Sequence, residues 1–121
     1  MTTILVVDDD ADTCRNMVDL FGDLGYAVEA AGGGETALEK ARRRPYDLGL
    51  LDLRMPGMDS LTVCRHPKRL RPRMVTMISA GYGGRDLNAE ASDAGARCVL
   101  PKPIHFPSLL ALVEQAVPHA G

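Results

Sequence analysis

Five short runs of β-favouring residues alternate with five segments that favour helix along the 121-residue chain. Parallel strands cannot be joined by a tight hairpin and need a crossover, which is usually a helix. The alternation therefore predicts an α/β fold, a doubly wound five-stranded parallel sheet flanked by five helices. At this length we expect a single domain over residues 1–121. The expected strands are Ile4–Val7, Tyr26–Ala30, Leu48–Leu51, Met74–Ile78 and Cys98–Leu100.

The first helix, expected over Ala11–Leu24, has the clearest apolar pattern. Cys14, Val18 and Phe21 recur at the spacing that places residues on one helix face. Such a stripe is typical of a helix that packs on a sheet. The residues expected to widen it are Met17, Leu20 and Leu24.

The other four helices are expected to differ in how firmly they pack. Glu35–Arg44 and Pro107–Val117 each carry an apolar face and end next to a proline. Met58–Leu70 contains Pro67, which costs roughly 3 kcal/mol inside a helix, so we expect a stop or kink near Arg65. Asp86–Ala94 has one leucine and small alanines to bury, so it should be the least firmly packed.

Composition and charge exclude several classes of protein. The net charge of −2 does not favour nucleic acid or an anionic membrane, and no apolar run has the length of a membrane span. No signal peptide is recognisable, so we expect a cytoplasmic protein without membrane contact. A basic cluster is interpreted as a solvated face rather than a docking patch for nucleic acid or a partner. It consists of Arg65, Lys68, Arg69, Arg71 and Arg73.

The three cysteines are odd in number and share no CxxC spacing. This usage argues against a disulfide framework or a zinc site and fits a reducing compartment. Cys14, Cys64 and Cys98 fall on expected packing faces or strands, so we interpret them as small core residues.

Five polar side chains follow the expected strands. Asp8 and Asp9 follow the first strand, Asp52 the third, and Ser79 the fourth, while Lys102 follows the fifth. In a doubly wound sheet, ligands bind beyond the carboxyl ends of the strands. The five side chains therefore fall on one edge, where a site is expected.

Three carboxylates at one place repel each other by about 4 kcal/mol per close pair at an effective dielectric near 20. The cluster needs a cation or a protonated member, and Mg²⁺ commonly binds one or two carboxylates together with phosphate oxygens. We therefore predict Mg²⁺ at Asp8 and Asp9, and a phosphoryl group as the partner of the metal. Asp52 is the candidate nucleophile for an aspartyl phosphate. Lys102 would bind the phosphoryl oxygens and Ser79 would donate a hydrogen bond.

Each of these residues also has a purely structural interpretation. Asp8 and Asp9, with Asp10, can act as the acidic start of a helix, and for Asp10 capping is the favoured role. Asp52 can be a turn residue, Ser79 a strand-end hydroxyl and Lys102 a solvated surface lysine. Because all of these residues fall at one edge of the sheet, the functional interpretation is favoured over the structural ones.

Four segments, "ILVVDDD", "LLDLRMPGMDS", "ISA" and "GARCVLPKP", occur in the order of a known family. They resemble the signature segments of the CheY-like response-regulator receiver domain of two-component signalling. The resemblance implies a flavodoxin-like sheet with strand order 2-1-3-4-5. It also implies phosphotransfer to Asp52 from a histidine kinase or phosphotransfer protein.

The resemblance further implies the roles of individual residues. Mg²⁺ would be held by Asp8 or Asp9, by Asp52 and by the backbone carbonyl of Arg54. Lys102 would pair with the phosphoryl group, and the Lys102–Pro103 peptide bond would be cis. A homodimer through helix four, strand five and helix five is compatible with the family.

The chain departs from the family pattern at several positions. Val99 stands where an aromatic residue is usual, so the coupling of a switch hydroxyl to an inward-swinging ring is in doubt. Ser79 replaces the commoner threonine and keeps the hydroxyl, Ser60 stands where glycine is usual, and Pro101 should stiffen the loop before Lys102. We hypothesise that the phosphorylation chemistry is retained while the output surface differs.

Three functions compete. The leading one is a signalling module that catalyses only its own phosphorylation and dephosphorylation and switches its helix-four and strand-five surface. A metal-dependent phosphatase is disfavoured because no second Asp lies two residues after Asp52 and no cap segment is present. The remaining alternative is an interaction module that works without phosphorylation.

Overall fold

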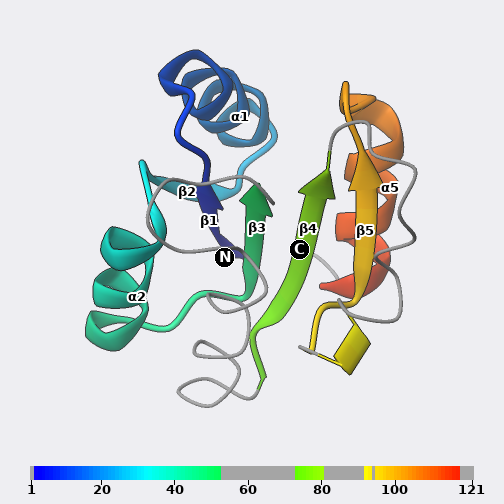
Figure 1. Ribbon diagram of the computed structural model, residues 1–121. Coiled ribbons are helices and arrows are strands. Elements are labelled where there is room, and N and C mark those ends of the chain that lie inside the picture. Colours follow the sequence, from blue (N-terminus) through cyan, green and yellow to red (C-terminus); the bar gives the residue numbers. More distant parts are fainter. Residues whose placement is uncertain (1, 53–72, 81–91, 94, 118–121) are drawn as a thin grey trace.

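The computed structural model describes residues 2–52, 73–80, 92–93 and 95–117. Its five strands form one parallel sheet in the order β2-β1-β3-β4-β5, which confirms the expected fold and topology (Figure 1). The strands are β1 (Thr3–Val7), β2 (Ala27–Ala31), β3 (Leu48–Asp52), β4 (Val75–Ala80) and β5 (Cys98–Pro101).

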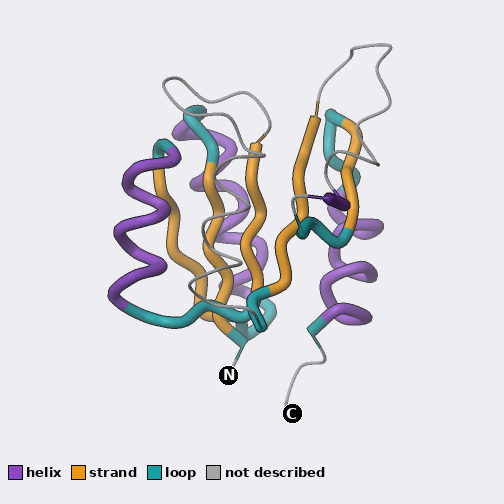
Figure 2. The backbone as a smooth tube through the Cα atoms, turned by 60° about the horizontal axis from the view of Figure 1, so that its bottom comes forward, coloured by secondary structure: helices purple, strands orange, loops and turns teal. Residues whose placement is uncertain are grey.

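Helices cover both faces of this sheet (Figure 2). The described helices are α1 (Ala11–Asp23), α2 (Gly34–Arg43) and α5 (Phe106–Ala116). Helices α1 and α5 share one face and α2 lies on the other, because each of the two buried clusters contains residues from a different set of helices.

Strand β1 explains why the central strands are apolar without alternation. Ile4 and Val6 belong to the cluster under α1 and α5, whereas Leu5 and Val7 belong to the cluster under α2. All four side chains are almost fully buried. A strand covered on both faces needs apolar side chains at every position.

Phe21 anchors α1 to its neighbours. Its side chain is fully buried, and its ring meets Tyr26 edge-on at a centroid distance of 5.5 Å and Phe106 at 5.0 Å. Aromatic pairs at such distances and angles stabilise a core beyond their buried area. Phe21 thereby connects α1, the residue before β2 and α5.

The apolar stripe of α1 is narrower than its sequence pattern predicts. Cys14, Met17 and Phe21 are buried, but Leu20 and Leu24 are 42% and 48% exposed. The prediction that these two leucines widen the buried stripe is therefore wrong. At 3.6 residues per turn Leu20 lies about 100° from the centre of the stripe. Leu24 lies past the end of the helix, at its C-cap.

Several expectations lie outside the described residues. They concern the helix at Met58–Leu70, most of the helix at Asp86–Ala94 and every member of the basic cluster except Arg73, which is exposed. Within the second segment only residues 92 and 93 are described, and both are helical. Among the described helices, none has both the length and the apolar character needed to cross a membrane.

Candidate functional site

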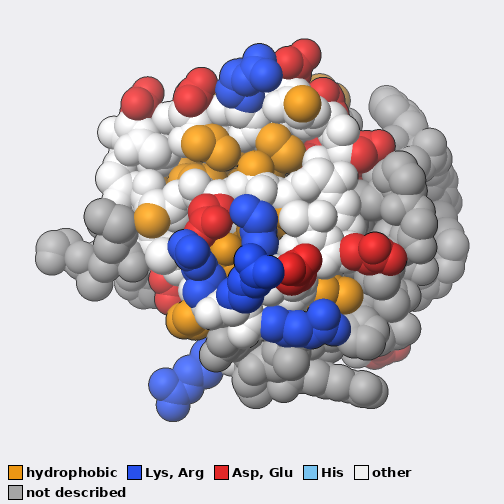
Figure 3. Space-filling model, turned by 90° about the vertical axis from the view of Figure 1, so that its left-hand side faces the viewer, with side chains coloured by type: hydrophobic (Ala, Val, Ile, Leu, Met, Phe, Trp, Pro, Cys, Tyr) orange, Lys and Arg blue, Asp and Glu red, His pale blue; other side chains and the backbone are white. Residues whose placement is uncertain are grey.

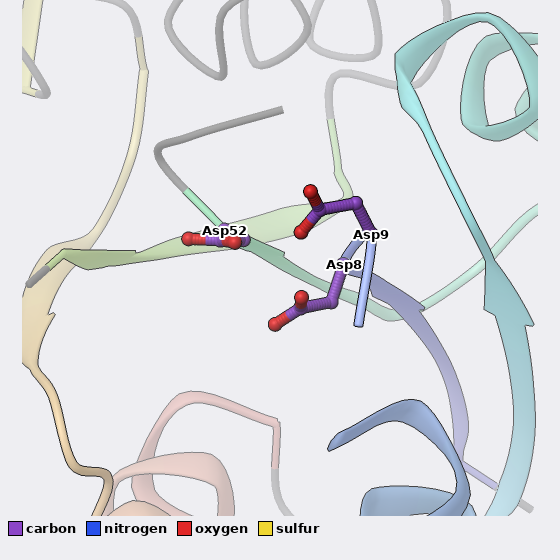
Figure 4. A group of neighbouring side chains, drawn as sticks. All are labelled: Asp8, Asp9 and Asp52. Atoms are coloured by element: carbon purple, nitrogen blue, oxygen red, sulfur yellow. The ribbon is translucent and has the colours of Figure 1, made fainter. Parts of the chain in front are cut away.

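Three carboxylates gather at the carboxyl ends of β1 and β3. Asp8 and Asp9 directly follow β1, and Asp52 is the last residue of β3. Val7 of β1 is the register partner of Leu51 of β3, so the residues that follow them emerge side by side. Each of the three aspartates offers a carboxylate oxygen, and these oxygens lie within 4.8 Å of one another (Figure 4).

Lys102 brings the positive charge to this cluster. Its Nζ lies 2.9 Å from Asp52 Oδ1 and 3.8 Å from Asp8 Oδ2. Asp8 and Asp52 are buried, with 5% and 6% exposure, whereas Asp9 is exposed. The arrangement therefore contains two buried carboxylates, one solvent-facing carboxylate and one ammonium group.

The pKa values of the site reflect this crowding. Burial, together with the negative charge of Asp52, raises the pKa of Asp8 above its ordinary value. Burial alone would lower the pKa of Lys102, but the hydrogen bond to Asp52 and the charges of the aspartates outweigh it and raise the pKa. Lys102 therefore remains protonated at neutral pH, and the ionised form of Asp8 is the costly one.

Hydrogen bonds hold the acidic turn between β1 and α1, which consists of Asp8, Asp9 and Asp10. The Asp8 N–H donates to the Ala31 carbonyl of β2 at 3.1 Å, and the Asp10 N–H donates to Asp8 Oδ1 at 2.9 Å. Asp10 caps α1 by accepting from the Asp12 N–H at 3.1 Å and from the Thr13 hydroxyl at 2.8 Å. These two bonds lower the pKa of Asp10, so it remains a charged cap, as the sequence predicts.

Cys14 adds a contact to the same turn that sequence reasoning missed. Its Sγ lies 3.4 Å from the main-chain oxygen of Asp8, and the side chain is buried. Burial, followed by the charge of Asp8, raises the pKa of the thiol, so it stays protonated and donates the hydrogen bond. The helical spacing indicated a core residue, and no sequence signal marks a cysteine whose thiol also meets a carbonyl.

Ser79 lies beside the nucleophile candidate on the neighbouring strand. It is the register partner of Asp52 and is buried inside β4, one residue before the strand ends. Its hydroxyl donates to the Leu51 carbonyl at 3.5 Å. To donate to a phosphoryl group on Asp52, the hydroxyl would have to leave this long hydrogen bond.

The loop that follows β5 positions Lys102. The Lys102 N–H donates to the Ala80 carbonyl of β4 at 2.9 Å, and the Lys102–Pro103 bond is cis, as the family resemblance implies. Val99 pairs with Ile78 in the sheet and is half-buried. The backbone thus directs Lys102 toward the carboxyl end of β3.

A cleft of about 650 Å³ opens next to Lys102. It lies between the first turns of α1 and the loop after β5, so a partner can approach the ammonium group from this side. The residues that line it are Asp10, Thr13, Asn16, Met17, Lys102, Pro103 and Ile104.

The donor set fits a hard divalent cation. Oxygen ligands from one or two carboxylates are what Mg²⁺ prefers, and three carboxylates converge here with one ammonium group to balance them. Arg54, the backbone ligand that the family resemblance implies, lies outside the described residues. The structure therefore brings together Asp8, Asp9, Asp52 and Lys102, with Ser79 on the adjacent strand.

Comparison with known proteins gives a consistent picture. A family model described as the response regulator receiver domain matches residues 4–114. Transcriptional regulatory protein ZraR of Escherichia coli O157:H7 is 39% identical over 116 residues, which is 96% of this chain and 26% of the relative. The chain thus spans about a quarter of the length of this relative.

Two solved structures extend the comparison to three dimensions. A CheY-like response regulator receiver domain protein from Methanospirillum hungatei JF-1 matches with a TM-score of 0.90 and 27% identity, over 95% of this chain and 92% of that one. A response regulator protein from Burkholderia pseudomallei, solved with a phosphorylated aspartic acid, calcium ion and citrate, matches with a TM-score of 0.85 and 25% identity. That match covers 92% of this chain and 65% of the other.

Proposed function

The chain belongs to the response regulator receiver domain family, and from this premise we propose that it accepts a phosphoryl group on Asp52 in a Mg²⁺-dependent reaction. The donor would be a histidine kinase or a phosphotransfer protein. The observation that carries the proposal is the convergence of three carboxylates with Lys102, whose Nζ lies 2.9 Å from Asp52 Oδ1. The phosphorylated aspartic acid of the similar Burkholderia pseudomallei protein supports the same chemistry.

Each residue has a defined part in the proposed transfer. A carboxylate oxygen of Asp52 attacks the phosphorus atom, and the bond from phosphorus to the donor nitrogen breaks. Lys102 balances the charge on the transferred oxygens, since it is protonated and already adjacent to the nucleophile. The Ser79 hydroxyl then exchanges the Leu51 carbonyl for a phosphoryl oxygen.

Asp8, Asp9, Asp52 and the carbonyl of Arg54 would hold Mg²⁺. When bound, the ion would supply positive charge to the phosphoryl oxygens, as Mg²⁺ does in other phosphoryl-transfer sites. Because the pKa of Asp8 is raised, the charged form of this buried residue is costly without a cation. A divalent ion would relieve that cost.

Labelling with a small phosphodonor tests the proposal. Acetyl phosphate with Mg²⁺ should add one phosphoryl group to the wild-type chain, detected by intact-protein mass spectrometry and mapped to Asp52. Asp52→Asn should abolish the label. Asp19→Asn removes an exposed carboxylate of α1 away from the edge and should label like wild type, which makes it the matched control.

The same experiment separates the competing functions. Label on an aspartate other than residue 52 would overturn the assignment of the nucleophile. Continuous hydrolysis of many free phosphate esters per chain would instead support a phosphatase. An unlabelled wild-type chain, under conditions that label a known receiver, would favour the interaction module that works without phosphorylation.

We also propose that phosphorylation changes the surface formed by β5 and the helix before it, and that this output differs from the family pattern. Val99 is a half-buried valine with no ring to swing inward, so the change must act through other side chains. Comparing NMR amide shifts with and without a phosphoryl mimic tests this. A rearrangement of the usual family kind, centred on the side chain of residue 99, would contradict it.

A homodimer is proposed through the surface that includes β5 and α5. Glu114 is the only charged residue in the eleven residues of α5, and Leu110 and Leu112 are only partly buried. A helix with so little charge is suited to partial coverage by another molecule. Most of helix four, expected at Asp86–Ala94, lies outside the described residues.

Direct binding of nucleic acid by this domain is not proposed. Basic side chains gather on the face that includes α2, but acidic side chains lie among them (Figure 3). Lys40 and Arg44 pair with Glu29, and Arg43 pairs with Glu39 at 2.7 Å. We therefore propose that the DNA binding of a longer relative, the DNA-binding transcriptional regulator NtrC of Escherichia coli, comes from parts that this chain does not match.

A further inference from the structure

Asp9 is the exposed carboxylate of the cluster, and its orientation depends on its neighbours. Within the described part of the chain, no hydrogen bond or ion pair holds the Asp9 side chain, whereas Asp8 accepts from the Asp10 N–H. The direction of Asp9 is therefore set by the backbone on either side of it. The peptide group that joins Asp8 to Asp9 is the nearest such element.

Cys14 contacts that peptide group from α1. The thiol donates to the Asp8 carbonyl, whose oxygen belongs to the Asp8–Asp9 peptide plane, at a sulfur–oxygen distance of 3.4 Å. Cys14 itself cannot easily move, because it is buried in the cluster under α1 and α5, and its own N–H donates to the Asp10 carbonyl at 3.1 Å. A buried carbonyl that loses its donor carries a desolvation penalty, so the peptide would turn to find another partner.

We infer that Cys14 is a positioning residue for the metal site: its thiol fixes the Asp8–Asp9 peptide so that both carboxylates face Asp52. The inference rests on the proposed Mg²⁺-dependent function. It adds a residue that a search for metal ligands would miss. Cys14 touches neither the ion nor the phosphoryl group. It acts through the backbone of the two aspartates that would bind the ion.

Two substitutions separate this role from simple core packing. Cys14→Ala removes the donor together with one heavy atom, whereas Cys14→Ser restores a donor at nearly the same place. Cys98→Ala is the matched control, because Cys98 is a half-buried cysteine packed against the same cluster and begins β5 rather than the acidic turn. Any effect of losing a thiol from this core should appear in both alanine variants.

The measurement is Mg²⁺ binding to the purified, unphosphorylated chain, followed by calorimetry and by NMR shifts of the Asp8, Asp9 and Asp52 amides. Partners of metal ligands typically change metal affinity 10–100-fold, and because a thiol is a weak donor we expect the low end, about tenfold weaker binding in Cys14→Ala. Cys14→Ser should bind within about twofold of wild type, and so should Cys98→Ala. Thermal unfolding of each variant is measured in parallel at the same pH.

The outcomes are distinct. Equal Mg²⁺ affinity in Cys14→Ala and wild type, with a fall in Tm like that of Cys98→Ala, would show that Cys14 is a packing residue and overturn the inference. If Cys14→Ala does not fold, Cys14→Ser decides the inference. Mg²⁺ affinity close to that of wild type supports it, and a loss of Mg²⁺ affinity as large as that of Asp8→Asn contradicts it. A wild-type chain that binds no Mg²⁺ would instead refute the proposed function, and this inference with it.

Discussion

At the scale of single residues, Asp8 carries the clearest conflict between stability and function. It is 5% exposed, and both burial and the charge of Asp52 raise its pKa. Lys102 lies 3.8 Å away and is closer to Asp52 than to Asp8. The negative charge of ionised Asp8 is therefore only partly balanced by Lys102 in the metal-free protein.

Asp8→Asn should stabilise the metal-free protein and weaken its metal binding. The amide keeps an oxygen that can accept from the Asp10 N–H while it removes the buried charge. We expect the free energy of unfolding to rise, because an incompletely balanced buried charge is removed, and Mg²⁺ affinity to fall at least about tenfold. Denaturant unfolding and Mg²⁺ titration measure the two effects, and a destabilised variant would contradict this view of Asp8.

The pH dependence of stability has a defined sign at the same residue. In the unfolded chain Asp8 titrates near 3.8, and in the native protein it titrates at a higher pH. Between these two values the native state holds a proton that the unfolded state has lost, so Asp8 makes the free energy of unfolding fall as pH rises. Without metal, wild type should lose stability relative to Asp8→Asn as pH increases through this window. If the free energies of unfolding of wild type and Asp8→Asn differed by the same amount at every pH, the raised pKa of Asp8 would be contradicted.

The residues of the site could be proposed from sequence because each follows a strand whose end could be recognised. Asp8, Asp9, Asp52 and Lys102 needed only the rule that parallel strands end at one edge. What the pattern could not show is burial, which makes Asp8 costly and leaves Asp9 in solvent. The contact of Cys14 with the Asp8 carbonyl depends on the angle at which α1 leaves the sheet, and no residue pattern encodes that angle.

At the scale of elements, α1 is held by a narrow set of side chains. Phe21 meets both Tyr26 and Phe106, whereas Leu20, one residue earlier, is 42% exposed. Apolar spacing identified the helix and its central stripe. It overestimated the width of the stripe, because leucines at the margin of a helix face are common on protein surfaces.

The pair Phe21→Ala and Leu20→Ala tests this packing of α1. Phe21→Ala creates a cavity where α1, β2 and α5 meet, so it should cost about 3–5 kcal/mol in the free energy of unfolding. Leu20→Ala removes an exposed side chain and should stay within about 0.5 kcal/mol of wild type. Chemical denaturation measures both, and similar losses in the two variants would show that the stripe is wider than the structure indicates.

At the scale of the whole molecule, the strand order could not be derived from the residues alone. The alternation of strands and helices predicts a parallel sheet, but it does not state which strand lies beside which. The order β2-β1-β3-β4-β5 was implied by the family resemblance and is present in the structure. That order matters for function, because it places β1 and β3 side by side and thereby Asp8 next to Asp52.

The proposed dimer is a prediction at this scale. Ala111 is exposed on α5, so Ala111→Glu should leave the fold intact while it places a charge on the proposed surface. Sedimentation velocity with Mg²⁺ and beryllium fluoride, a phosphoryl mimic, should show a dimer for wild type and a monomer for this variant. Leu20→Glu adds the same charge at an exposed position of α1 and should still dimerise. Wild type that stays monomeric, or two variants that behave alike, would rule out this surface.

We propose that the carboxyl ends of β1, β3 and β5 hold a metal ion and a phosphoryl group together. A crystal structure of the chain with Mg²⁺ and beryllium fluoride tests it most directly. We expect the fluoride complex on a carboxylate oxygen of Asp52, Lys102 in contact with its fluorine atoms, and Mg²⁺ coordinated by Asp52 with Asp8 or Asp9. A mimic bound elsewhere, or Mg²⁺ without contact to any of the three aspartates, would contradict it.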